Sequence, residues 1–154
     1  MGEIKFEFTG ILKEATDGGP CRRLPERKTK GSAGYDFYNP KKVEIAPHTN
    51  KLIMTGIKAK FPNDVVLQLY NRSSNPTKKG VILTNSVGII DADYYGNPDN
   101  DGDIGFMFYN FKDEPVIFEA GERLGQGIFM KYSTVTNEEE ITNERIGGFG
   151  STNK

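Results

Sequence analysis

The sequence predicts an all-β protein that is built from many short strands. Its apolar residues recur in short runs, several of them with a period of two, which is the spacing of a half-buried strand. No window of about ten residues carries the wider apolar stripe of an amphipathic helix. Eighteen glycines and eight prolines interrupt the chain often, as the turns between short strands require. Together these observations favour a β-sandwich, a jelly roll or a small barrel.

Each expected strand rests on its own local pattern. Three runs alternate apolar with charged or polar residues, as strands with one solvated face do: IKFEF at 4–8, VEI at 43–45 and IKAKF at 57–61. The others are β-rich runs bounded by Pro, Gly, Asn or Asp: VVLQLY at 65–70, GVILT at 80–84, IGFMFYNF at 104–111, PVIF at 115–118 and GIFMKY at 127–132.

The chain divides into a β-domain, residues 1–132, and a tail, residues 133–154. The stretch TNEEEITNER at 136–145 is polar and acidic, so we interpret it as a linker or arm. The chain then ends in RIGGFGSTNK, where glycines and hydroxyls offer converging donors for a phosphate. No helix can follow this cradle, but a mobile arm with anion ligands is suited to close over a bound phosphate. The alternative is a Gly-rich terminus without a ligand.

Composition excludes several classes of protein. The formal net charge is −1 and 27% of the residues are charged, so we expect no direct binding to nucleic acid or membranes. The N-terminal MGEIKFEFTG lacks the apolar core of a signal peptide, and no apolar run approaches the length of a membrane span. The single cysteine, Cys21, fits a reducing compartment, so we expect a cytoplasmic protein.

The segment NRSSNPTKKG at 71–80 is a candidate anion site directly after a strand. Arg72 offers a fork of donors, Ser73 and Ser74 add hydroxyls, and Lys78 and Lys79 add positive charge. The alternative interpretation is an ordinary polar turn. The spacing is not that of a Walker loop.

The segment TNSVGIIDADYYG at 84–96 is the most informative of the chain. We expect a hairpin whose tip presents Asp91 beside the aromatic Tyr94 and Tyr95. A carboxylate next to bound phosphates can orient and deprotonate a water, and an aromatic ring can pack on a sugar or base. Alone, the pattern would favour a turn-forming Asp and a strand Tyr.

The stretch GNPDNDGD at 96–103 resembles the first half of an EF-hand loop. Its twelfth position is Phe108 where a bidentate Glu is required, so we reject a calcium site. We expect instead an exposed acidic loop inserted in a hairpin. His48, in a turn, and Cys21 have no catalytic partner near them in the sequence.

Taken together and in order, five segments resemble the motifs of the trimeric dUTPases: AGYDF (33–37), RSSNPTKKG (72–80), NSVGIIDADYYG (85–96), GERLGQ (121–126) and GGFGST (147–152). The resemblance implies a jelly-roll-like (β-clip) subunit and a homotrimer with shared active sites. It also implies hydrolysis of dUTP to dUMP and pyrophosphate, which limits uracil incorporation into DNA and supplies dUMP for dTTP synthesis. In this family the C-terminal arm closes a site that other subunits build, which explains a phosphate cradle at a chain end.

The resemblance also implies roles for individual residues. Asp91 would activate the water that attacks the α-phosphorus, and Tyr94 would lie against the deoxyribose. The uracil edge would be read by a pocket too tight for the methyl group of thymine, formed by Asn85, Gly88, Ile89, Ile90 and the backbone of Asp91.

The remaining roles concern the phosphates and the metal. Arg72, Ser73, Ser74 and Gln126 would hold the α- and β-phosphates. The arm would contribute Arg145, Phe149, Gly150, Ser151 and Thr152, with Phe149 over the uracil and the polar groups at the γ-phosphate. Mg²⁺ prefers phosphate oxygens and water, so Asp36 would bind it through water.

The sequence departs from the family pattern at four places. In the fourth motif LGQ replaces IAQ, which is a mild change. Asn71 stands where Gly or Pro is usual, Arg145 lies two residues before Gly147 where three is commoner, and the Gly96–Asp103 loop lengthens the third motif. We expect that loop to affect substrate access or to contact a protein partner. Two other functions remain open at this point: a dCTP deaminase of the same fold, and a regulatory protein that uses the nucleotide site as a switch.

Overall fold

The regular secondary structure is almost entirely β-strand, as the sequence predicts, in a computed structural model that describes residues 2–10 and 22–150. The strands of these residues are β1 (Lys5–Phe8), β2 (Tyr35–Tyr38), β3 (Val43–Ile45), β4 (Asn50–Met54), β5 (Ile57–Lys60), β6 (Val65–Asn71), β7 (Val81–Leu83), β8 (Gly88–Ile90), β9 (Gly105–Asn110), β10 (Val116–Phe118) and β11 (Arg123–Lys131). Helical structure there is limited to a π-helical turn at Asn75–Lys79 and a 3₁₀ turn at Ala92–Tyr94. In this part of the chain no helix is long and apolar enough to cross a membrane.

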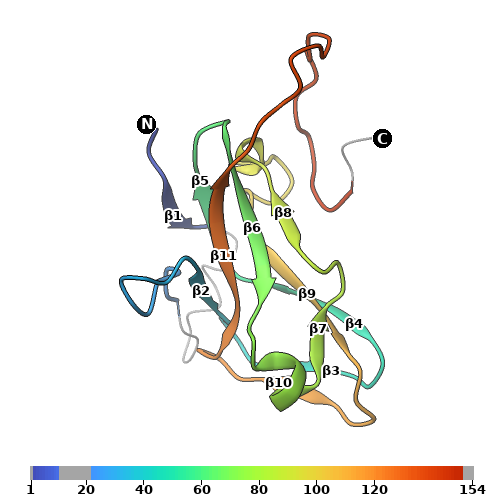
Figure 1. Cartoon of the computed structure of the whole chain (residues 1–154). Coiled ribbons are helices and arrows are strands. Elements are labelled where there is room, and N and C mark those ends of the chain that lie inside the picture. Colours follow the sequence, from blue (N-terminus) through green and yellow to red (C-terminus); the bar gives the residue numbers. More distant parts are fainter. Residues whose placement is uncertain (1, 11–21, 151–154) are drawn as a thin grey trace.

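The strands form two larger antiparallel sheets and two strand pairs (Figure 1). The largest sheet has the order β2-β11-β6-β8, and a second sheet has the order β4-β9-β7. β1 pairs with β5, and β10 pairs with β3. β11 is the central element, because it pairs with β2 on one side and with β6 on the other, so that Gln126 stands opposite both Asp36 and Tyr70.

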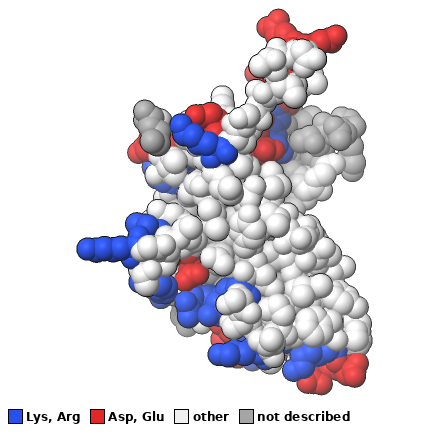
Figure 2. Space-filling model, in the orientation of Figure 1, with Lys and Arg blue, Asp and Glu red and all other residues white. Residues whose placement is uncertain are grey.

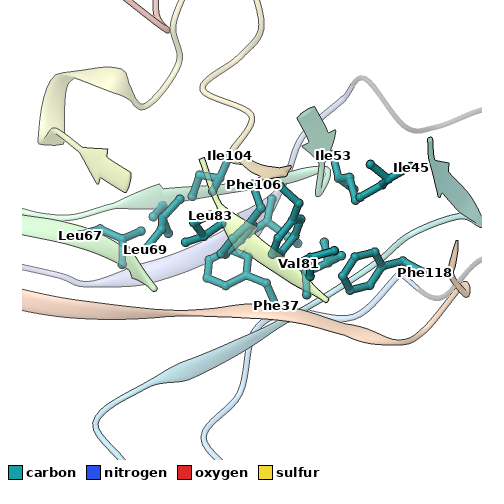
Figure 3. Packing of buried hydrophobic residues seen from close by; sticks show 14 of the residues in the cluster. Phe37, Ile45, Ile53, Leu67, Leu69, Val81, Leu83, Ile104, Phe106 and Phe118 are labelled. Carbon is teal, nitrogen blue, oxygen red and sulfur yellow. The ribbon is translucent and has the colours of Figure 1, made fainter. Parts of the chain in front are cut away.

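An aromatic core joins the sheets (Figure 3). Phe37 of β2, Phe106 and Phe108 of β9 and Phe118 of β10 are almost completely buried. The Phe37 and Phe106 rings meet edge to face with centroids 5.3 Å apart, and Phe108 stacks on Phe118 at 5.0 Å. The alternating burial along β6 and β9 follows from their apolar periodicity, with every second side chain in this core.

Three strands are absent from the strand runs that the sequence predicts, and one of them, β8, lies in the segment predicted as a hairpin. The other two are β2 and β4. β2 reads YDFY and β4 reads NKLIM, and both carry charged or polar residues within the strand. The first three residues of β4 are exposed and only Ile53 is fully buried, so no apolar alternation marks this strand. Pairing with β11 and β9 determines these two strands, and their own sequences do not.

The predicted hairpin at 84–96 is wrong. β7 pairs with β9 in one sheet, whereas β8 pairs with β6 in the other, so residues 84–87 cross between sheets. Asp91 follows β8 and begins the 3₁₀ turn that carries Tyr94. Each strand therefore satisfies its backbone groups with a strand that is distant in sequence, which local pattern cannot reveal.

The C-terminal arm leaves the end of β11 and then returns toward the domain (Figure 1). Residues 133–150 contain no strand or helix, and most of them are exposed. The arm comes back beside β8 of its own chain, where Arg145 reaches the carboxylates that follow this strand. This placement differs from the family expectation of an arm that closes a site of other subunits.

Candidate active site

A cavity of about 440 Å³ lies between β8, the 3₁₀ turn and the returning arm. Its volume is within the range of about 300–1,000 Å³ that small-molecule sites occupy. Most of the residues that line it belong to the predicted third and fifth motifs. The lining consists of Leu69, Asn85, Gly88, Ile89, Ile90, Asp91, Tyr94, Gly105, Met107, Arg145, Gly148, Phe149 and Gly150.

The wall of the cavity includes the edge of a sheet. β8 is the last strand of its sheet and, among the described strands, pairs with β6 alone. An edge strand has backbone N–H and C=O groups that no neighbour satisfies, and these can bind a planar ligand with donors and acceptors on one side. Gly88 also packs closely on β6, because a Cβ there would lie 3.0 Å from Leu69 Cβ.

Arg145 of the arm binds two carboxylates at the mouth of this cavity. Its Nη2 donates to Asp91 Oδ2 at 2.7 Å, and its Nε donates to Asp93 Oδ1 at 2.7 Å. A further bond, from Nη1 to the carbonyl oxygen of Gly147 at 3.1 Å, orders the arm beside the guanidinium. The side chain of Arg145 is 14% exposed, whereas those of Asp91 and Asp93 are 55% and 59% exposed. The carboxylates therefore stay open to solvent and to a ligand.

The rest of the arm packs on Tyr94. A Cβ on Gly148 would lie 2.8 Å from Tyr94 Cε1, so this glycine permits close contact between the arm and the ring. The Phe149 and Tyr94 rings meet edge to face with centroids 6.3 Å apart. Phe149 itself is 57% exposed, which leaves one side of its ring free at the cavity.

The hydroxyl end of Tyr94 is held by the Gly96–Asp103 loop. Tyr94 Oη donates to the carbonyl oxygen of Asp103 at 2.7 Å and accepts from Asn100 Nδ2 at 2.8 Å. Burial raises the pKa of the Tyr94 hydroxyl, which keeps it protonated as this donor.

The prediction of an exposed acidic loop in a hairpin is only partly right, because Gly96, Pro98 and Asp99 are exposed but no hairpin surrounds the loop. The loop joins the 3₁₀ turn to β9, and Asn97 and Asp103 are only 3% and 1% exposed. Asp103 Oδ1 accepts the backbone N–H of Gly56 at 2.8 Å. Burial raises the pKa of Asp103 to about 6, and the backbone N–H groups of Gly56 and Ile57 oppose this shift.

The predicted phosphate ligands form a second group, at the far end of β6. Leu67 stands opposite Ile90, so Asp91 is level with Val66, and Arg72 lies six residues farther along. An extended strand rises about 3.3 Å per residue, so Arg72 is roughly 20 Å from the level of Asp91. Arg72, Ser73, Ser74 and Gln126 are therefore not brought together with Asp91 in one chain.

Asn71, the first departure from the family pattern, organises this second group. Its Oδ1 accepts the backbone N–H of Arg72 at 2.9 Å and Asn75 Nδ2 at 2.7 Å. Asn71 Nδ2 donates to the carbonyl oxygen of Val81 at 3.2 Å, and its own carbonyl accepts Gln126 Nε2 at 3.4 Å. The substitution thus supplies the bonds that fix the backbone at Arg72.

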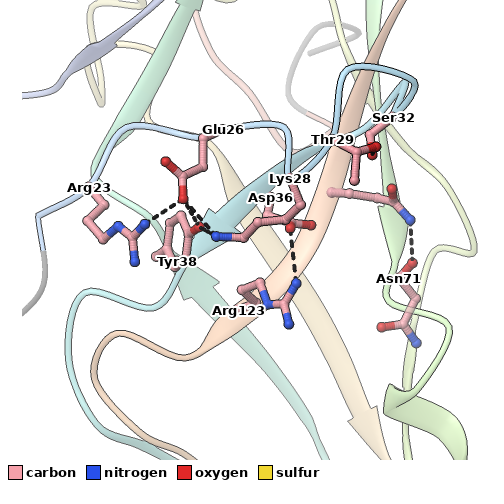
Figure 4. A network of polar contacts seen from close by, with 10 residues as sticks. Arg23, Glu26, Lys28, Thr29, Ser32, Asp36, Tyr38, Asn71 and Arg123 are labelled. Carbon is pink, nitrogen blue, oxygen red and sulfur yellow. Dashed lines mark hydrogen bonds and ion pairs between the residues drawn. The ribbon is translucent and has the colours of Figure 1, made fainter.

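The predicted metal ligand lies near this second group. Asp36 Oδ2 pairs with Arg123 Nη1 at 3.3 Å (Figure 4). Asp36 is in β2, where it stands opposite Gln126 of β11. A glycine makes room for Gln126, since a Cβ on Gly34 would lie 2.1 Å from Gln126 Oε1. Residues 2–10 and 22–150 contain no group of three or more His, Cys, Asp or Glu that could hold a metal ion.

A polar cluster supports the segment that precedes β2 (Figure 4). Glu26 Oε1 accepts from Arg23 Nη2, Lys28 Nζ and Tyr38 Oη. The hydrogen bonds from Lys28 and Tyr38 lower the pKa of Glu26 to about 2. The backbone of Glu26 also forms a bridge with that of Asp36, so the cluster lies beside the predicted metal ligand.

The predicted residues thus divide into two sets and a remainder. Asn85, Gly88, Ile89, Ile90, Asp91, Tyr94, Arg145, Phe149 and Gly150 surround one cavity. Ser151, Thr152 and Cys21 lie outside the described residues. His48 is an exposed turn residue as expected, and its Nε2 contacts Asp113 Oδ1 at 2.8 Å, a partner remote in sequence.

Sequence reasoning missed the pairing of Arg145 with both carboxylates and the support of Tyr94 by Asn100 and Asp103. The first joins residues more than fifty positions apart, so no local signal marks it. The support of Tyr94 could have been suspected from the departure from the family pattern, because the loop that lengthens the third motif begins two residues after Tyr94.

Comparison with known proteins identifies the family of this chain. The model of the dUTPase family matches residues 22–153. A deoxyuridine 5'-triphosphate nucleotidohydrolase from Lactococcus lactis is 51% identical over 130 residues, which are 84% of this chain and 87% of that protein. The dUTPase crystal structure from Streptococcus mutans superposes with a TM-score of 0.77 and 42% identity, covering 86% of this chain and 98% of that one.

More distant structures share the fold. A mutant dUTPase from phage phi11 of S. aureus, described with a structural Mg(II) ion, superposes with a TM-score of 0.69 at 20% identity, over 92% of this chain and 98% of that one. The family match spans most of the chain, and it includes both groups of candidate residues and the arm. The chain therefore belongs to the dUTPase family.

Proposed function

We propose that this chain hydrolyses dUTP to dUMP and pyrophosphate, with Asp91 as the base that activates the attacking water. The observation that carries the proposal is the convergence of Asp91, Asn85 and Tyr94 with the edge strand β8 in one cavity. Asp91 is half-exposed at the mouth, where a water can lie between its carboxylate and a bound phosphate. Attack of this water on the α-phosphorus breaks the bond to the bridging oxygen, and pyrophosphate leaves.

The uracil ring is recognised by the free edge of β8. The backbone of Gly88–Ile90 and the side chain of Asn85 offer donors and acceptors to its polar edge, and the close contact of Gly88 with Leu69 limits the depth of the pocket. Satisfying these bonds discriminates more strongly than steric exclusion of the thymine methyl group. Phe149 covers the base, and Tyr94 lies beneath the deoxyribose.

The phosphates extend to Arg72, Ser73, Ser74 and Gln126 of a neighbouring subunit. Because Arg72 lies roughly 20 Å from the level of Asp91 along β6, one triphosphate cannot reach both groups of a single chain. We therefore place the active sites between the subunits of a homotrimer, each site with one group from each of two chains. The arm adds Arg145, Gly150, Ser151 and Thr152 at the γ-phosphate.

The surface of the subunit is consistent with such an assembly. Strands β6, β7, β8 and β9 contain no Asp, Glu, Lys or Arg. Figure 2 shows a broad uncharged area on the face where these strands lie, with the charged side chains toward its margins. Ile89 and Ile82 are 55% and 43% exposed, as apolar residues at a subunit contact are before association.

Mg²⁺ fits this chain as a companion of the substrate. The described residues form no cluster of three ligands, and a hard cation of this size prefers phosphate oxygens and water. Asp36 would hold such a hydrated ion through water, once Arg123 turns to the phosphates. The ion, when bound, neutralises charge on the triphosphate. We place the reaction in the cytoplasm, with a free nucleotide as substrate and no nucleic acid or membrane partner.

The test is pyrophosphate release with Mg²⁺ from dUTP, dTTP, dCTP and UTP, on the wild type and on Asp91→Asn. We expect turnover of dUTP alone. The substitution should lower kcat by about 10²–10⁴ with little change in KM, because the base acts in the transition state. Ammonia release from dCTP would point to a deaminase, and tight dUTP binding without turnover would point to a regulatory protein. An equal loss in kcat and in substrate affinity would contradict the role of Asp91.

A further inference from the structure

The Gly96–Asp103 loop has no part in the proposed reaction, yet it makes both hydrogen bonds of the Tyr94 hydroxyl. Asn100 donates to this hydroxyl at 2.8 Å, and the hydroxyl donates to the carbonyl oxygen of Asp103 at 2.7 Å. Tyr94 is only 5% exposed. The loop therefore determines where the far end of the ring lies.

The loop itself is firmly fixed. Asn100 Oδ1 accepts the backbone N–H of Gly102 at 3.1 Å, and the Asp103 carboxylate accepts the N–H of Gly56 at 2.8 Å. Gly102 has a φ of 76°, and a Cβ there would lie 2.4 Å from the carbonyl oxygen of Tyr94. Gly102 is thus packed tightly against the backbone of the turn that carries Tyr94.

The ring side of Tyr94 faces the cavity and the arm. Tyr94 lines the cavity together with Asp91, and Gly148 approaches its ring closely. A ring that excludes UTP by contact with its 2′-hydroxyl can do so only if that hydroxyl does not push the ring aside. A tether at the Tyr94 hydroxyl provides this resistance.

We propose that the Gly96–Asp103 loop holds the Tyr94 ring against the sugar, and that Asn100 is a positioning residue for the preference of dUTP over UTP. This inference rests on the proposed function. It assigns the lengthened third motif to the subunit's own active site, where it sets sugar specificity through Tyr94.

The experiment compares kcat/KM for dUTP and UTP in three variants of the loop. Asn100→Asp keeps the size of the side chain and the acceptor for Gly102 but removes the donor to Tyr94. Asp99→Asn is the control, because Asp99 is exposed in the same loop. The double variant Asp99→Asn with Asn100→Asp exchanges the two side chains and leaves the loop charge unchanged.

We expect the dUTP to UTP ratio to fall about fivefold in Asn100→Asp and in the exchange variant, which corresponds to one hydrogen bond of about 1 kcal/mol. Asp99→Asn should keep the wild-type ratio. Tyr94→Phe retains the ring but lacks the hydroxyl, so its dUTP to UTP ratio should fall as in Asn100→Asp. It therefore provides a second test if Asn100→Asp folds poorly.

An unchanged ratio in Asn100→Asp and in Tyr94→Phe would overturn the inference and leave the proposed function intact. Equal losses for both nucleotides, with a lower Tm, would also overturn it, since they indicate a structural role only. Failure of the wild type to release pyrophosphate from dUTP would overturn the proposed function, and the inference with it.

Discussion

At the scale of single residues, Arg145 shows how the arm can exchange partners. Its guanidinium bridges Asp91 and Asp93, but both carboxylates are more than half exposed, and ion pairs with exposed partners contribute only about 0–1 kcal/mol. Moving the guanidinium to a triphosphate therefore costs little. The same fork of donors that binds carboxylates suits phosphate oxygens.

Replacing Arg145 with Lys should weaken dUTP binding selectively. Lysine keeps the charge but lacks the paired donors, so we expect KM for dUTP to rise about threefold to tenfold, with kcat less affected. The inhibition constant of dUDP, which has no γ-phosphate, should be unchanged. Steady-state kinetics with dUDP as inhibitor measure both. A parallel loss of dUDP affinity would contradict a role at the γ-phosphate.

The sequence predicts those site residues that belong to a motif, and it misses those that support the motif from outside. Asp91, Asn85 and Tyr94 fall in one cavity as the third motif indicates. Asn100 and Asp103 escape prediction because an acidic, Gly- and Pro-containing stretch is typical of an exposed loop. Their burial depends on contacts with Tyr94 and with Gly56, and the latter lies more than forty residues away.

At the scale of elements, apolar alternation predicts the strands that face the core and fails for those that do not. β6 and β9 bury every second residue and were predicted within one or two residues of their ends. β4 buries only Ile53 completely, so its sequence carries no strand signal. The pairing of β8 with β6 could not be predicted either, because residues 84–87 look like a local turn.

The Gly96–Asp103 loop should give the protein a distinctive pH dependence. The pKa of Asp103 is raised from 3.8 to about 6 by burial, so between these values the folded state binds more protons than the unfolded state. The free energy of unfolding should therefore fall as the pH rises through this range. Above about pH 6, Asp103 should contribute little further change. Glu26, whose pKa is lowered, acts in the opposite sense, but only below about pH 4.5.

Urea unfolding between pH 5 and pH 7 measures this effect, with Asp103→Asn as the reference. Asparagine keeps the acceptor for the N–H of Gly56 but cannot ionise. The variant should gain stability relative to the wild type as the pH rises from 5 to 7. Two curves that stay parallel over this range would show that Asp103 does not titrate there.

At the scale of the whole molecule, each chain carries two separate groups of candidate residues, which we propose to face different neighbouring subunits. Asp91 and the arm lie at one end of β6, and Arg72 lies at the other. The uncharged strands between them provide the surface on which subunits can meet (Figure 2). The sequence motifs predict both half-sites, but their separation follows only from the register of β6 with β8.

Subunit complementation tests this arrangement most directly. Arg72→Ala and Asp91→Asn should each be nearly inactive alone, and the two are mixed by unfolding and refolding together. In a threefold assembly with sites between chains, a random mixture should recover about a quarter of wild-type pyrophosphate release, because some sites receive both intact residues. A mixture as inactive as its components would contradict the account and place Arg72 and Asp91 of the same chain in one site.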